Sequence, residues 1–252
     1  RSLALAQSRR VGLHVDNCLG GFLLSYMSKQ GLFTRKWDLS TPGVTSISVD
    51  VHKYGFSSKG VSVCGFKDPE LRRASYMPSA DGCEGLYITP TLQGSRSGAQ
   101  IAQAWATLQR VGDYGYREMA RDIAGLIDRV KATVKSIPEL KLLVEPDAAI
   151  VPISSDTIDI YAVSSVLESK GWNMFTGQKP KVMSVCLGEQ HLQSLDAWAD
   201  DLRAAVKEVV DNPGMKLSGA AAVYGAASTA PDEVLDEILR SYNDIRTMVK
   251  KK

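Results

Sequence analysis

The stretch SISVDVHKYG, residues 46–55, decides the fold that we predict for this 252-residue chain. Its β-branched residues predict a strand that ends in the pair His52-Lys53, followed by a turn at Gly55. At such an edge of a sheet, partial desolvation lowers the pKa of a lysine and makes its amine nucleophilic toward a carbonyl. Taken alone, the dipeptide favours an ordinary solvated lysine. The surrounding sequence instead favours a Schiff-base role for Lys53.

A second stretch, VGLHVDNCLGGF at residues 11–22, places an aspartate at the end of another predicted strand. The apolar residues deliver Asp16 to a carboxyl end, and the two glycines allow a helix to begin close by. Lys53 follows Asp16 by 53 − 16 = 37 positions. Pyridoxal phosphate requires a carboxylate that keeps its pyridine nitrogen protonated and a lysine that binds its aldehyde. The alternative for Asp16 is an N-cap of the following helix.

Further motifs occur in the same order along the chain: LHVD with CLGG at residues 13–21, DVHKYG with KG at 50–60, and YITPTLQGSR at 87–96. In order and spacing they resemble sphingosine-1-phosphate lyase, of the group II pyridoxal-phosphate-dependent decarboxylases. The resemblance continues more loosely through residues 170–173 and 222–225. It implies an α/β fold of the fold type I (aspartate-aminotransferase-like) kind. This chain would supply the C-terminal part of the large domain plus the small α/β domain.

The resemblance also implies roles for individual residues. Lys53 would form the Schiff base with the cofactor, Asp16 would pair with the pyridinium nitrogen, and His52 would hydrogen-bond the cofactor phosphate. Gly94 and Ser95 would reach the cofactor phosphate of the neighbouring subunit, since glycine exposes backbone N–H groups and serine adds a hydroxyl donor.

Lys59 resembles a second lysine of the family, which would bind the phosphate of the substrate. An ammonium on a flexible stem suits a phosphate dianion, although a plain loop lysine beside Gly60 is an equal alternative. Arg96, after the phosphate-binding pair, could instead form structural carboxylate pairs. Asn17 and Gln93 depart from the commonest pattern of the family. We therefore do not carry over the family's detailed geometry beside the cofactor ring to this chain.

For the intact protein, the resemblance implies a pyridoxal-phosphate-dependent carbon–carbon lyase that cleaves sphingosine 1-phosphate to a long-chain aldehyde and phosphoethanolamine. It implies a homodimer with shared active sites, at the cytosolic face of the endoplasmic reticulum membrane in eukaryotes or in the cytoplasm of a bacterium. The alternatives are an amino-acid decarboxylase and a non-catalytic dimerisation or scaffold module. We expect the chain to be the C-terminal portion of a longer polypeptide, because the family's first phosphate-binding glycine turn and stacking histidine have no counterpart. Any membrane association would come through the N-terminal part.

Three parts are expected along the chain: residues 1–96 in the cofactor-binding large domain, connecting helices at 97–137, and a small α/β domain at 138–252. In the middle part, apolar residues recur every three or four positions, with a break expected at residues 112–115. In the last part we expect adjacent strands at 140–144 and 148–153, a helix at about 157–170 ended by Gly171, a strand at Val182, a helix that begins at Ser194, and a last helix that begins at Pro231.

Composition excludes some functions. With 44% hydrophobic residues, 23% charged residues and a formal net charge of +2, the chain can bury a core and has no bias toward nucleic acid. The basic run at residues 250–252 is expected to be a solvated tail. No apolar stretch reaches the roughly 18 residues that a membrane span needs. The four cysteines show no metal-ligand spacing, and Cys64 and Cys186 are expected in the core.

Overall fold

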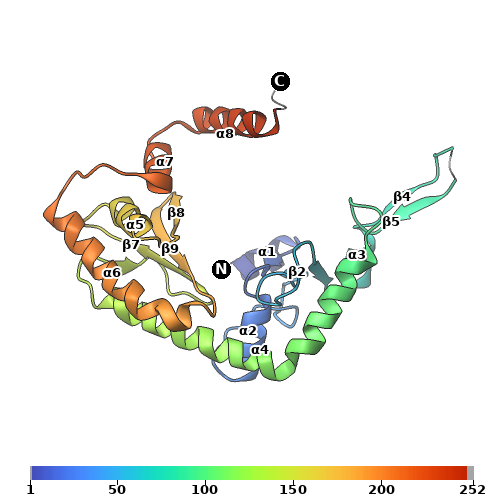
Figure 1. The fold of residues 1–252 in the computed structure, drawn as a ribbon. Helices are drawn as coiled ribbons and strands as arrows, with labels where there is room; N and C mark the ends of the chain where they lie inside the picture. Colours follow the sequence, from blue (N-terminus) through green and yellow to red (C-terminus); the bar gives the residue numbers. More distant parts are fainter. Residues whose placement is uncertain (1, 84, 249–252) are drawn as a thin grey trace. The chain divides into compact units, whose positions relative to one another are not determined.

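The computed structural model describes residues 2–83 and 85–248, and the chain divides into two compact units, residues 1–124 and 125–252 (Figure 1). The basic run at 250–252 therefore lies outside the described residues. The helix α4 (Gly98–Lys135) belongs partly to each unit. The sequence predicted domain boundaries at residues 96 and 137, and α4 lies between these two positions. The three-part division stays a proposal.

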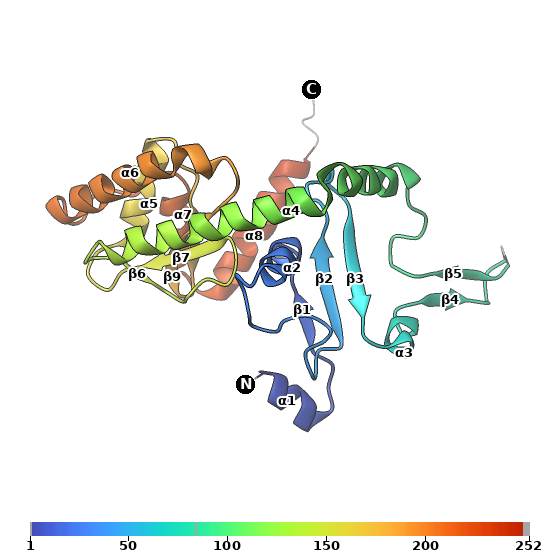
Figure 2. The same ribbon diagram turned by 90° about the horizontal axis from the view of Figure 1, so that it is seen from below.

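Unit 1 is built around a three-stranded sheet of order β1-β2-β3. Helices and a two-stranded ribbon of β4 and β5 complete the unit. In chain order its elements are α1 (Ser2–Arg9), β1 (His14–Asp16), α2 (Gly21–Lys29), β2 (Ser46–Asp50), β3 (Ser62–Phe66), α3 (Pro69–Arg73), β4 (Met77–Ser79), β5 (Tyr87–Thr89) and the first part of α4. Strands β1 and β2 are parallel, with Asp16 opposite Ser48, whereas β2 and β3 are antiparallel. The parallel pair brings the carboxyl ends of β1 and β2 to the same edge (Figure 2).

The helix α2 packs on one face of this sheet because a glycine lets it approach β2. A Cβ atom on Gly21 would lie 2.6 Å from a methyl carbon of Val49, so a larger residue would push the helix away. Side chains alternate along a strand, so Ser48 and Asp50 point to the opposite face from Val49. The sheet therefore has an apolar face under α2 and a polar face that carries the candidate site.

The long helix α4 contains the predicted break. Gly112 has φ 64° and ψ 178°, a conformation that interrupts the helix and is almost restricted to glycine. The predicted apolar stripe is confirmed, since all of its members are buried: Tyr116, Met119, Ile123, Leu126, Val130, Val134 and Ile137.

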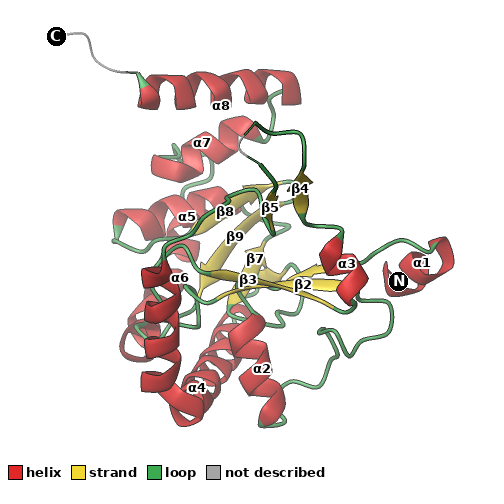
Figure 3. Ribbon diagram, turned by 90° about the vertical axis from the view of Figure 1, so that its right-hand side faces the viewer, coloured by secondary structure: helices red, strands yellow, loops and turns green. Residues whose placement is uncertain are grey.

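Unit 2 contains a four-stranded antiparallel sheet of order β6-β7-β9-β8 with helices packed on it (Figure 3). After α4 its elements are β6 (Lys141–Leu142), β7 (Ile150–Ser154), α5 (Ile160–Ser169), β8 (Phe175–Gln178), β9 (Lys181–Cys186), α6 (His191–Asp211), α7 (Gly219–Ala227) and α8 (Asp232–Thr247). The strands predicted at 140–144 and 148–153 are confirmed as the pair β6 and β7. Gly171, with φ 92°, follows α5 as expected of a glycine that ends a helix.

Two predictions about local structure are wrong. The helix α6 begins at His191, three residues before the predicted Ser194, and the Ser194 hydroxyl donates to the Gln190 carbonyl at 3.2 Å instead of capping the helix. Cys64 is exposed, because it lies opposite Ser48 in the register of β2 and β3 and so belongs to the polar face of the sheet. Cys186 is half-buried. Within the described ranges, no helix combines the length and apolar character that a membrane crossing demands.

Candidate active site

Asp16 and Lys53 lie at the carboxyl edge of the parallel pair in unit 1, and both contact Cys18. The pairing of β1 with β2 extends past the strand ends, since the Asn17 amide donates to the Ser48 carbonyl at 3.0 Å and the Asp50 amide donates to the Cys18 carbonyl at 3.1 Å. Lys53 lies in the turn that follows β2, three residues beyond Asp50. The two predicted cofactor residues therefore come from adjacent strand ends.

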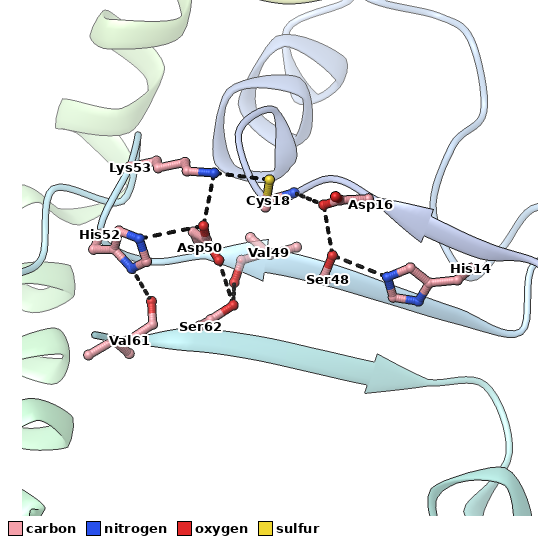
Figure 4. A network of polar contacts seen from close by, with 10 residues as sticks. All are labelled: His14, Asp16, Cys18, Ser48, Val49, Asp50, His52, Lys53, Val61 and Ser62. Atoms are coloured by element: carbon pink, nitrogen blue, oxygen red, sulfur yellow. Dashed lines mark hydrogen bonds and ion pairs between the residues drawn. The ribbon is translucent and has the colours of Figure 1, made fainter. Parts of the chain in front are cut away.

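The Lys53 amine lies between a thiol and a carboxylate (Figure 4). Its Nζ atom donates to Cys18 Sγ at 3.0 Å and lies 2.9 Å from Asp50 Oδ2, and 29% of the side chain is exposed. The hydrogen bond to Cys18, followed by the hydrogen bond to Asp50, raises the pKa of Lys53, and these effects outweigh the opposing effect of burial. The predicted lowering of this pKa by desolvation is therefore wrong in this structure, since the lysine is held as an ammonium ion.

Asp50 is the acidic residue at the centre of the network. Its Oδ1 accepts a hydrogen bond from Ser62 Oγ at 2.5 Å, and its Oδ2 lies 3.5 Å from His52 Nε2. Burial raises the pKa of Asp50, but hydrogen bonds from Ser62 and Lys53 outweigh burial and leave that pKa below its usual value. Sequence reasoning gave Asp50 no role, although its place three residues before Lys53 allows the two side chains to meet across a turn.

Asp16 is an exposed carboxylate at the end of β1. Its Oδ1 accepts from the Cys18 amide at 3.1 Å and from Ser48 Oγ at 3.0 Å, and the Ser48 hydroxyl lies 3.2 Å from His14 Nε2. Hydrogen bonds from the Cys18 side chain and amide, and then from Ser48, lower the pKa of Asp16. The N-cap position of α2 is occupied by Gly20, so the alternative role of Asp16 as its N-cap is wrong.

A buried tyrosine from α4 holds the turn that carries Lys53. Tyr116 is 1% exposed, and its hydroxyl donates to the Gly55 carbonyl at 2.8 Å. Its ring stacks parallel to Phe56 at 6.2 Å between centroids and also contacts Phe22. Burial raises the pKa of Tyr116 to about 12, so the hydroxyl stays a donor. The sequence placed this tyrosine only in a packing stripe and missed its contact with the turn.

Of the residues predicted to bind phosphate, only His52 belongs to the network around Lys53. His52 Nδ1 lies 2.7 Å from the Val61 carbonyl and so donates to it, and its Nε2 faces Asp50, so a phosphate would compete with Asp50 for this ring. Lys59 is exposed in the turn before β3, where its side chain has no hydrogen bond or ion pair with any described residue. Gly94, with φ 62°, and the exposed Ser95 lie in the loop after β5, outside the network around Lys53. The roles predicted for these residues stay predictions.

The residues at this edge fit pyridoxal phosphate. Asp16 presents an ionised carboxylate that suits a protonated ring nitrogen, and Lys53 presents a primary amine that suits an aldehyde. Both contact Cys18, the former through the backbone amide and the latter through the thiol sulfur. The chemistry of the donors therefore matches the two ends of a pyridoxal ring.

Solved structures define the class to which this fold belongs. The sphingosine-1-phosphate lyase of Burkholderia pseudomallei superposes with a TM-score of 0.84 and 31% identity, covering 98% of this chain and 52% of that one. The glutamate decarboxylase of Lactobacillus brevis superposes with a TM-score of 0.64 over 84% of this chain and 52% of that one, at 20% identity, which shows the fold alone. The chain has the fold of fold type I pyridoxal-phosphate-dependent enzymes, as predicted.

Sequence comparison finds sphingosine-1-phosphate lyases among the relatives of this chain. The chain is 39% identical to the sphingosine-1-phosphate lyase of Arabidopsis thaliana over 241 residues, which is 95% of this chain and 44% of that protein. No protein-family model matches the chain. It is a homologue of sphingosine-1-phosphate lyases, and it spans about half the length of the curated relatives that it matches.

Proposed function

We propose that this chain is the C-terminal portion of a pyridoxal-phosphate-dependent lyase that cleaves sphingosine 1-phosphate to a long-chain aldehyde and phosphoethanolamine. The observation that carries the proposal is that the Asp16 carboxylate and the Lys53 amine both contact Cys18, the former through the backbone amide and the latter through the sulfur. This pair lies in a chain similar to sphingosine-1-phosphate lyases over 95% of its length.

In this proposal the cofactor, when bound, supplies an electron sink for the charge left by breaking a carbon–carbon bond. Lys53 would hold the cofactor through its aldehyde, and its amine would be displaced by the amine of the substrate. Asp16, kept ionised by hydrogen bonds from Cys18 and Ser48, would stabilise a proton on the ring nitrogen. Tyr116 holds the turn that carries Lys53, so that the lysine nitrogen returns to the same position after each turnover.

Lys59 is proposed to bind the phosphate of the substrate. Its exposed ammonium lies in a loop held to α4, because Ser58 Oγ donates to Gln103 Oε1 at 2.5 Å. In the proposed homodimer, each active site is completed by a second copy of the protein. Gly94 and Ser95 of that copy would bind the cofactor phosphate. The proposed location is the cytosolic face of the endoplasmic reticulum membrane for a eukaryotic protein and the cytoplasm for a bacterial one.

The proposal is tested by assaying the intact protein, supplied with pyridoxal phosphate, for aldehyde release from sphingosine 1-phosphate. We expect wild type to release aldehyde, Lys53→Ala to lose at least about 1,000-fold in rate because it lacks the nucleophile, and Lys67→Ala, an exposed lysine just after β3, to match wild type. Release of carbon dioxide from free amino acids without aldehyde release would instead establish the decarboxylase. Absence of bound cofactor would point to the scaffold module.

A further inference from the structure

Asp50 holds both basic residues of the predicted cofactor site. Its carboxylate lies 2.9 Å from Lys53 Nζ and 3.5 Å from His52 Nε2, and only 13% of its side chain is exposed. The backbone fixes it on both sides: its amide donates to the Cys18 carbonyl, and Ser62 lies opposite it in β3. The hydroxyl of Ser62 donates to the remaining carboxylate oxygen. This carboxylate is therefore anchored independently of the lysine.

Four described groups that titrate or carry charge form the network around the Lys53 amine. Cys18, before α2, offers its sulfur at 3.0 Å and connects through its amide to Asp16, while Asp50 on β2 faces both the amine and His52. A thiol sulfur is a weak acceptor, whereas a carboxylate carries a full charge at neutral pH. Of these two partners of the amine, only Asp50 brings a full negative charge to it.

We propose that Asp50 is a positioning residue that holds Lys53 as an ammonium ion whenever the lysine nitrogen has no covalent partner, and thereby sets how readily this lysine adds to a carbonyl. An ammonium ion has no lone pair to donate, so Lys53 must first pass one proton to solvent. Its nitrogen then forms the bond to the carbonyl carbon, and the carbonyl oxygen leaves as water. When the amine of a substrate takes the place of Lys53, the lysine nitrogen regains a proton and returns to Asp50. This catalytic meaning rests on the proposed function, but the ionisation of Lys53 does not.

Competitive labelling of amines tests the proposal on the 252-residue chain without cofactor or substrate. The chain is treated with trace acetic anhydride over a range of pH, and the acetylation of Lys53 and of exposed Lys59 is followed by peptide mass spectrometry. In Asp50→Asn, we expect Lys53 to react about tenfold faster at mildly alkaline pH, because loss of one adjacent opposite charge lowers its pKa by about one unit. Lys59 should react at an unchanged rate, since it lies outside the network.

Three further variants separate Asp50 from its neighbours. Asp50→Glu keeps the charge, so the acetylation rate of Lys53 should stay as low as in wild type. Ser62→Ala removes only the hydroxyl that anchors Asp50, so we expect a smaller rise in that rate than in Asp50→Asn. Cys18→Ala removes the weaker acceptor, so its effect on the rate should also be smaller than that of Asp50→Asn. Circular dichroism shows whether each variant folds. If the acetylation rate of Lys53 is unchanged in both Asp50→Asn and Ser62→Ala, the proposal is wrong. The proposal is also wrong if Cys18→Ala alone gives the full tenfold increase in that rate. Because no cofactor is present, failure of the proposed lyase activity would leave this result unaffected.

Discussion

At the scale of single residues, the candidate site is a set of charges held in place by uncharged donors. Asp16 is held by the Cys18 amide and the Ser48 hydroxyl, and Asp50 by the Ser62 hydroxyl. Each donor stabilises the ionised form of its carboxylate. The site therefore keeps Asp50 ionised beside Lys53 and keeps Asp16 ionised at the end of the neighbouring strand.

The ionisation of Asp50 and Lys53 predicts how stability depends on pH. The pKa of Asp50 is lowered from 3.8, so its contribution is present above that value and is lost as pH falls through the folded-state pKa. The pKa of Lys53 is raised from 10.5, so its contribution is present below that value and is lost as pH rises through the folded-state pKa. We expect Asp50→Asn to lower the free energy of unfolding by about 1 kcal/mol between these limits.

Urea unfolding of the chain across this pH range measures the effect. The Asp50→Asn and wild-type curves should converge at the acidic end. A difference that stays constant from neutral to strongly acidic pH would contradict the ion pair as its cause, and Lys67→Ala supplies the control.

The sequence predicted the two residues that define this chemistry but not the network that connects them. Asp16 and Lys53 follow apolar strands, so the pattern predicted a strand end for each. The parallel pairing that brings these ends to one edge comes from the structure. The predicted direction of the Lys53 pKa was wrong because the amine has hydrogen bonds to Cys18 and Asp50, which outweigh burial. Asp50 is a turn neighbour whose side-chain position depends on Ser62 of β3. Such a contact across strands has no periodic signal in the sequence.

At the scale of elements, α4 gives a direct test of the role of its glycines. Gly112 has φ 64° and ψ 178°, so Gly112→Ala should lower the free energy of unfolding by about 1–3 kcal/mol. Gly125 lies in the same helix with open space around its Cα, so Gly125→Ala should raise that free energy by about 0.5–1 kcal/mol. Urea unfolding of both variants measures the two changes. Equal effects of the same sign would contradict the break at Gly112.

Elements with a clear period were predicted well, and boundaries were predicted poorly. The buried stripe of α4 follows from the spacing of its apolar residues. Ser194 is a preferred N-cap residue, but α6 begins at His191, whose Nδ1 accepts from the Gly188 amide at 3.0 Å. The helix α7 was not predicted because its alanine-rich sequence has no polar side, and only Ala221 of this helix is buried.

At the scale of the whole molecule, the ribbon of β4 and β5 leaves apolar side chains in water. Leu86 and Leu92 are each 90% exposed and Ile88 is 65% exposed, close in sequence to the predicted phosphate ligands Gly94 and Ser95. Such exposure is typical of surfaces that another protein covers. It supports the proposed homodimer, in which this segment would serve the site of a second copy.

Sedimentation of the intact protein tests this assembly. Wild type should sediment as a dimer, and Leu92→Asp should shift it toward monomer because a charge would be buried in the interface. Val144→Asp, at a residue in unit 2 that is 61% exposed, is the matched control and should leave the dimer intact. A fully active monomer of the wild-type protein would contradict the shared site.

The central claim is that Lys53 is the covalent attachment point of pyridoxal phosphate, and borohydride reduction of the intact protein with this cofactor tests it most directly. Reduction fixes the Schiff base, and peptide mass spectrometry locates the label. We predict one label, on Lys53, that is absent from Lys53→Ala and retained in Lys67→Ala. A label on Lys59 or another lysine with Lys53 unmodified, or no label at all, would contradict it.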